Sequence, residues 1–121
     1  MAMEVGPGVF VSRVDTDDWT PDPEVGGDQH ILAAVEGAFV GMSRFVDVAD
    51  PDPWLVTERE TIVVLEGAAR IEIAGGPTLE LEVGDMASIP KGALTTWHLT
   101  QPYREIWFFA RPYDGAIATD D

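Results

Sequence analysis

The sequence predicts an all-β domain, a sandwich or a barrel, and three observations lead to this prediction. Short runs of apolar and β-branched residues recur at roughly 8–12 residue spacing. Several runs alternate apolar and polar residues, which is the period of a strand with one buried face. The 12 glycines and 9 prolines are spread between the runs as turn residues, and no long helical period is present.

In the first part of the chain we expect strands over 9–14, 30–35 and 39–46. Loops are expected over 15–29, which is rich in Pro and Gly, and over 47–53. The second loop contains two Asp-Pro steps, which favour extended backbone before each proline.

The remaining strands are clearer because their alternation is regular. We expect them over 61–65, 69–73, 79–83, 86–89, 95–99 and 105–110. Gly75-Gly76 predicts a hairpin turn, and Glu80 and Glu82 are expected to face outward. The run Ile106–Ala110 is too apolar for a strand that is wetted on one side, so a second subunit is expected to cover it.

Length and charge restrict the class of protein. A chain of 121 residues predicts one domain over 1–121, with core motifs over 40–110, N-terminal strands over 9–36 and a frayed acidic tail over 113–121. The net charge of −15 and the scattered basic residues argue against nucleic-acid binding and against an acidic membrane surface. Cysteine is absent, and no apolar run approaches a membrane span or a secretory leader, so a cytoplasmic protein is expected.

Residues 60–97 carry a family resemblance. The spaced elements are Glu60 with Gly67, Gly84-Asp85, Pro90-Lys91-Gly92 and Thr96-Trp97. Together they resemble the two motifs of the cupin family, and the pattern is similar to the small cupins related to ureidoglycine aminohydrolase and the ethanolamine-utilisation cupin. The resemblance covers residues 40–110 and implies a double-stranded β-helix, the cupin jelly roll barrel.

The resemblance also implies where a metal would bind. Metallo-cupins place two histidines shortly before the glutamate and a third beyond the Pro-Gly turn. This sequence has Trp54, Val56 and Thr95 at those positions, so that only Glu60 remains. One carboxylate does not hold a catalytic divalent metal, which needs three or four protein ligands. We therefore expect no metal and no other cofactor.

Glu60 is the leading candidate for chemistry. At the start of a strand it is expected to point into the barrel with Ile62 and Val64. A carboxyl group in an apolar pocket has a raised pKa, which suits a general acid or base near neutral pH. The alternative is that Glu60 has no function and is paired with Arg44 or a backbone N–H group.

The other candidates depend on which face of a strand they occupy. Thr95 and Trp97 share one face, so Trp97 either stacks on a ligand or packs in the core, and Trp54 leaves the same choice. His98 falls on the opposite face, but a bulge would turn it inward as the acid–base partner of Glu60. Arg44 either faces outward or points inward to Glu60 or to a ligand carboxylate.

Two functions remain open, together with a third arrangement. The first is a metal-independent isomerase, cyclase or lyase that uses Glu60, with His98 as a second catalytic residue, on a small organic molecule. Trp54, Val56, Thr95, Trp97 and Arg44 would bind that molecule. The second is a non-catalytic module that binds a small ligand, and the third is a metal site built from His98 and Glu60. In each case we expect a homodimer.

Overall fold

The computed structural model describes residues 2–35 and 37–110, and these residues form antiparallel strands joined by turns and loops. The strands are β1 (Met3–Gly6), β2 (Val9–Val11), β3 (Thr20–Pro21), β4 (Asp28–Val35), β5 (Ala38–Phe45), β6 (Trp54–Leu55), β7 (Glu60–Ile73), β8 (Thr78–Glu82), β9 (Met86–Ile89) and β10 (Leu94–Ala110). The all-β jelly roll predicted from the sequence is confirmed. No helix among these residues is long and apolar enough to cross a membrane.

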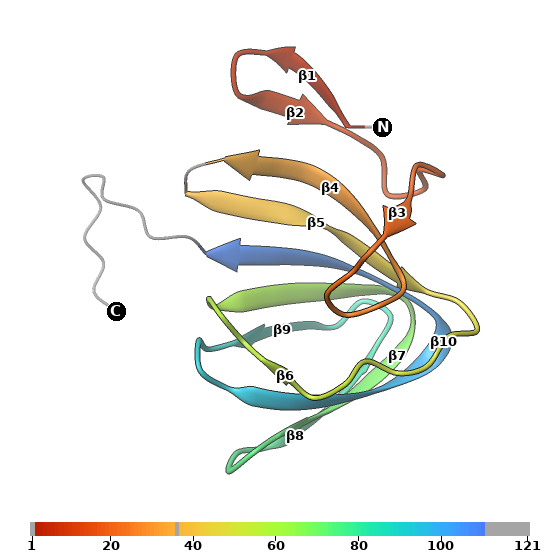
Figure 1. Cartoon of the computed structure of the whole chain (residues 1–121), viewed down its shortest axis with the longest axis vertical. Helices are drawn as coiled ribbons and strands as arrows, with labels where there is room; N and C mark the ends of the chain where they lie inside the picture. Colours follow the sequence, from red (N-terminus) through yellow and green to blue (C-terminus); the bar gives the residue numbers. More distant parts are fainter. Residues whose placement is uncertain (1, 36, 111–121) are drawn as a thin grey trace.

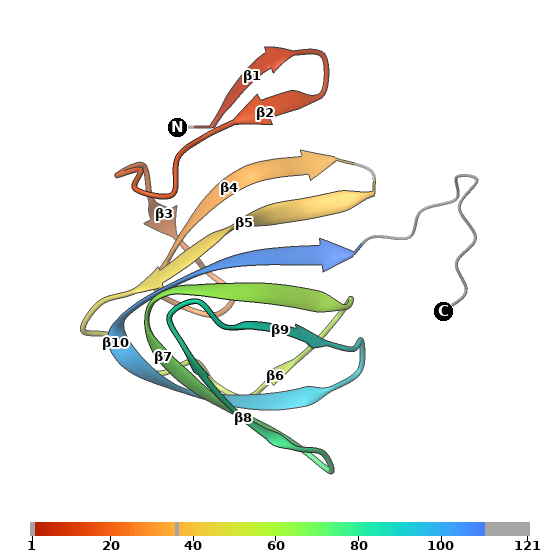
Figure 2. The ribbon, with the colours of Figure 1, turned by 180° about the vertical axis from the view of Figure 1, so that it is seen from behind.

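Two long, bent strands connect the two layers of the barrel (Figure 1). The end of β10 pairs with the start of β7, and the start of β10 pairs with the end of β7. The main sheet runs β3-β4-β5-β10-β7-β8, while β9 adds to the first half of β7 and β6 to the first half of β10. Figure 2 shows from behind how this sheet curls into a barrel.

The bend explains why four of the predicted strands form only two strands in the structure. The runs at 61–65 and 69–73 are one strand, as are those at 95–99 and 105–110. The turn is made at Gly67, which has a positive φ of 77°. A side chain there would meet the carbonyl oxygens of Thr100 and Pro102, so the two bent strands approach each other closely only because residue 67 is glycine.

The N-terminal part differs from the prediction in extent. Strand β2 ends at Val11 rather than residue 14, and it pairs with β1 in a separate two-stranded sheet. The predicted loop at 15–29 contains the short strand β3 and the first residues of β4. The predicted acidic tail at 113–121 lies outside the described residues.

The N-terminal segment covers part of the outer face of the main sheet. The His30 ring nitrogens bond to the Ser12 hydroxyl at 2.7 Å and to the Asp18 carbonyl oxygen at 2.8 Å. The Arg44 guanidinium lies 4.6 Å from the centre of the Trp19 ring. His30 is consequently buried.

Candidate functional site

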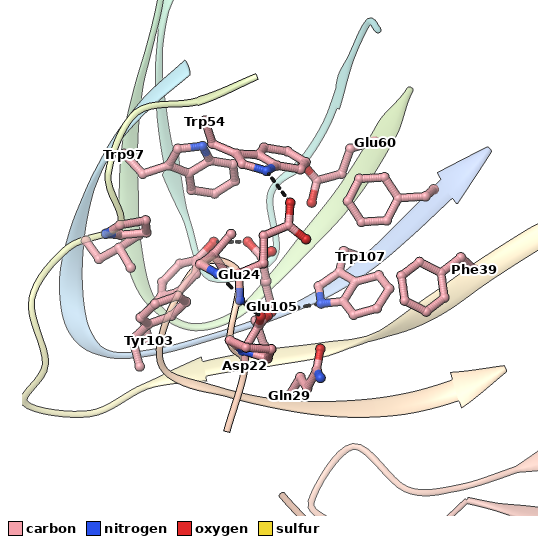
Figure 3. Close-up of a pocket in the computed structure, with 17 residues that line it drawn as sticks. Asp22, Glu24, Gln29, Phe39, Trp54, Glu60, Trp97, Tyr103, Glu105 and Trp107 are labelled. Atoms are coloured by element: carbon pink, nitrogen blue, oxygen red, sulfur yellow. Dashed lines mark hydrogen bonds between the residues drawn. The ribbon is translucent and has the colours of Figure 1, made fainter. Parts of the chain in front are cut away.

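A cavity of about 220 Å³ lies inside the barrel, and its walls come mostly from β5, β10 and the loop between β3 and β4, while β7 contributes Glu60 (Figure 3). Seven aromatic side chains and four carboxyl groups line it. The aromatic residues are Phe39, Phe45, Trp54, Trp97, Tyr103, Trp107 and Phe109. The carboxyl groups belong to Asp22, Glu24, Glu60 and Glu105.

Glu60 begins β7 and points into this cavity. Period two places it on the same face as Ile62 and Val64, which are completely or almost completely buried. Its side chain is 4% exposed, and its Oε1 atom has no hydrogen-bond partner among the described residues. Burial raises the pKa of Glu60 well above its ordinary value, and the nearby charge of Glu105 raises it further. This agrees with the raised pKa expected from the sequence.

Glu105 is the second carboxyl group of the cavity, and the sequence reasoning missed it. It lies on β10, and the Tyr103 hydroxyl donates a hydrogen bond of 2.6 Å to its Oε1 atom. Burial raises the pKa of Glu105 to about 7, although the bond from Tyr103 lowers it in part. The pKa of Tyr103 is itself raised by burial and by Glu105, so its hydroxyl stays protonated. The structure therefore places two buried, interacting carboxyl groups in one cavity.

The signal for Glu105 was present in the alternation of β10. Counting in twos from Trp97 reaches Tyr103, Glu105, Trp107 and Phe109, all of which line the cavity. The strongly apolar run around Trp107 favoured a strand buried on both faces, so the alternation in this part of β10 was not recognised. In the structure Phe108 is 46% exposed, so its face of β10 is open among the described residues.

Hydrogen bonds hold the indole rings of Trp97 and Trp107 in place. Trp97 Nε1 donates to the Thr95 hydroxyl at 2.9 Å, and this hydroxyl donates to the Trp54 carbonyl oxygen at 2.8 Å. Trp107 Nε1 donates to the Ser43 hydroxyl at 2.8 Å. Trp54 and Trp97 both line the cavity, as the ligand-wall alternative required.

The loop between β3 and β4 contributes carboxyl groups from the other side of the cavity. Asp22 accepts hydrogen bonds from the backbone N–H groups of Glu24, at 2.8 Å, and Val25. Trp54 Nε1 donates to Glu24 Oε2 at 2.9 Å, which ties the loop to the aromatic wall (Figure 3). No pattern in the sequence connects this loop with Glu60.

The other predicted site residues do not line the cavity. Val56 and Thr95 are buried in the wall behind it, at 1% and 0% exposure. Arg44 turns outward and donates to Asp28 at 2.8 Å. His98 also faces outward, where its Nε2 atom lies 3.6 Å from Glu72 Oε1. The structure therefore does not bring Arg44 or His98 to Glu60.

The residues at the usual metal positions do not fit a divalent cation. Trp54 and Val56 offer no side-chain ligand atom, and the Thr95 hydroxyl is already bonded on two sides. Among residues 2–35 and 37–110, no three His, Cys, Asp or Glu side chains come together in a way that could hold a metal. A metal site built from His98 and Glu60 also fails, because Glu60 points into the barrel and His98 faces outward.

Comparison with known proteins identifies the family to which this fold belongs. The model of the EutQ-like cupin domain family matches residues 52–107, which contain Glu60, the β7–β8 hairpin and most of β10. The chain belongs to the cupin superfamily. No curated protein sequence matches this cupin.

Solved structures of other cupins share the fold. An ethanolamine utilization protein Q from Salmonella typhimurium LT2 is 19% identical, with a TM-score of 0.71 over 91% of this chain and 92% of that one. The EutQ protein of Clostridium difficile is 18% identical, with a TM-score of 0.68 over 92% and 94%. KdgF from Halomonas sp. is 22% identical, with a TM-score of 0.64 over 80% and 88%.

Proposed function

We propose that this protein is a metal-independent cupin that catalyses proton transfer on a small organic molecule held in the barrel cavity. The observation that carries the proposal is the pair of buried carboxyl groups on Glu60 and Glu105. Both have raised pKa values, and one oxygen of Glu60 is unpaired among the described residues although it is buried. A buried polar atom without a partner is costly, and a substrate would supply the missing partner.

The two carboxyl groups suit different halves of a proton transfer. Glu105, with a pKa of about 7, is ionised in part near neutral pH and accepts a proton as the base. The pKa of Glu60 is raised further when Glu105 is charged, so Glu60 stays protonated and donates its proton as the acid. Tyr103 holds the Glu105 carboxylate in position through its hydroxyl.

This chemistry is redox-neutral and needs no covalent intermediate. One proton leaves the substrate for Glu105 and another reaches it from Glu60, which produces an isomer, a ring closure or an elimination. No Ser–His or Cys–His pair is recognisable in the sequence, so the carboxyl pair is the acid–base machinery that the cavity offers. His98 has no part in this proposal because its side chain lies on the outer face of β10.

A non-catalytic binding module is the second candidate, and the rigidity of the aromatic wall favours it. The indole N–H groups of Trp54, Trp97 and Trp107 are all bonded to protein acceptors, so the wall is ordered before any ligand arrives. Such pre-organisation lowers the entropic cost of binding a ligand, whether or not a reaction follows.

Hydrogen exchange in heavy water tests the proposal. Small molecules that co-purify with the protein are released by denaturation, identified by mass spectrometry and returned to fresh protein in D₂O. Acid–base catalysis predicts deuterium incorporation at carbon, seen by proton NMR, which Glu60→Gln and Glu105→Gln both abolish. Glu80→Gln, on the exposed face of β8, is the matched control and keeps full exchange. A bound molecule that exchanges nothing, or exchange that survives Glu60→Gln, contradicts catalysis by this pair.

A further inference from the structure

The charges around the cavity are all of one sign. Among the described residues that line it there are four carboxyl groups, and Lys, Arg and His are absent from the lining. Arg44, the nearest candidate in the sequence, is turned away to Asp28. A ligand carboxylate or phosphate would therefore find no counter-ion and would be repelled by the existing charges.

The aromatic wall offers electron-rich ring faces rather than hydrogen-bond donors. The three indole N–H groups of the cavity are used by Glu24, Thr95 and Ser43. The faces of these rings remain available to a ligand. The Phe109 ring lies beside them, with its centre 5.8 Å from the centre of the Trp54 ring and 5.4 Å from that of the Trp107 ring. Aromatic faces attract cations, and the attraction grows when water is excluded.

Glu60 supplies an independent observation that points to a ligand. Its Oε1 atom is buried and unpaired among the described residues, and its side chain is directed into the same cavity (Figure 3). An ammonium group beside it would pair with the negative charge of the Glu60–Glu105 carboxyl pair while its alkyl groups contact the rings. A polar but uncharged ligand would satisfy the oxygen and would gain nothing from the rings beyond burial.

We propose that the ligand of this cavity is a small alkylated ammonium ion, seated against the tryptophan rings with its positive charge beside Glu60. This names the substrate class of the acid–base site and in that sense rests on the proposed function, although binding is measured without turnover. The volume of about 220 Å³ corresponds to about seven water molecules in the liquid, which limits the cation to a small head group. An inorganic ion does not fit, because hard cations require six or more oxygen ligands and the wall is largely aromatic.

Three probes of nearly the same shape test the sign of the preferred charge. Choline carries a trimethylammonium group, 3,3-dimethylbutan-1-ol replaces it by an uncharged tert-butyl group, and 3,3-dimethylbutanoate carries a negative charge. Titration by calorimetry and by tryptophan fluorescence should show choline binding about tenfold more tightly than the alcohol, with the carboxylate weakest. This comparison uses the unmodified protein, so it does not depend on the folding of any variant.

A variant then assigns the preference to the cavity. Glu60→Gln keeps the shape and removes one of the two carboxyl groups of the pair that would hold the cation, so it should lower the ratio of choline to alcohol affinity by at least about threefold. Glu80→Gln removes one charge from the exposed face of β8 and should leave the ratio unchanged, which separates a local effect from the net charge of −15. Circular dichroism confirms that both variants are folded.

The results distinguish this inference from the proposed function. Choline selectivity without hydrogen exchange on any ligand retains the cation site and rejects catalysis. Exchange on an uncharged or anionic molecule that depends on Glu60 retains catalysis and overturns the cation site. Equal affinity for choline and the alcohol, tighter binding of the carboxylate, or choline binding weaker than about 10 mM also overturns it.

Discussion

Replacing Glu105 by Gln should make the protein more stable at alkaline pH and should remove much of its pH dependence. Glu105 is buried, with 5% of its surface exposed, and burial raises its pKa from 4.5 in the unfolded chain to about 7 in the fold. The folded state therefore binds one more proton than the unfolded chain between these two values. The free energy of unfolding consequently falls as the pH rises through this window, and the loss is complete above pH 7.

The size of this loss follows from the same two pKa values. The difference between 4.5 and about 7, at 1.36 kcal/mol for each pH unit, amounts to about 3 kcal/mol. Gln has nearly the same shape, and its amide oxygen can still accept the bond from the Tyr103 hydroxyl. The variant should thus gain up to about 3 kcal/mol over the unmodified protein at pH 8, and much less at pH 4.5. For a chain of this length the gain corresponds to a rise in melting temperature on the order of 10 °C.

Urea denaturation followed by tryptophan fluorescence at pH 4.5, 6 and 8 measures this effect. Glu80→Gln is the control, because it removes the same charge from an exposed position on β8 and leaves the buried pair intact. Its stability curve should run parallel to that of the unmodified protein. If the Glu105→Gln curve were also parallel, Glu105 would not be a buried group with a raised pKa, and the acid–base pair would lose its base.

Three further predictions concern the fold, the cavity and the assembly. Gly67→Ala should lower stability by about 2 kcal/mol or more in urea denaturation, because its Cβ would meet two carbonyl oxygens at a positive φ; Gly75→Ala, with a positive φ but open space, should cost less. Trp97→Phe should weaken ligand binding by about 0.5–1.5 kcal/mol in calorimetry, and unchanged affinity would make Trp97 a core residue only. Light scattering at micromolar concentration should give twice the chain mass of 13.1 kDa, because Met86 and Phe108 leave apolar surface on the outer face of the sheet. The mass of a single chain would contradict a homodimer. Phe108→Glu should dissociate the dimer and give the mass of a single chain.

Most of the fold prediction rests on the two-residue alternation of apolar and polar side chains along the strands. Alternation and turn residues predicted nearly every strand from β4 to β10, because each strand buries one face and the pattern is local. What local pattern did not reveal is that two pairs of strands are single bent strands. That continuity depends on the close approach of β7 and β10 at Gly67, a contact between residues more than thirty positions apart.

For the site, sequence analysis alone predicts that Glu60 enters an apolar interior, that Trp54 and Trp97 are candidates for its walls, and that the usual metal ligands are replaced. These conclusions depend on residue identity and on period two within one strand. The neighbours of Glu60 in the cavity depend on strand pairing, which the sequence pattern does not reveal. Pairing of β7 with β10 brings Glu105 and Tyr103 into the cavity, and the β3–β4 loop adds Glu24. Pairing of β5 with β4 places Arg44 beside Asp28, and alternation on β10 sends His98 outward. The pKa of a carboxyl group depends on burial and on neighbouring charges, which are properties of the assembled fold.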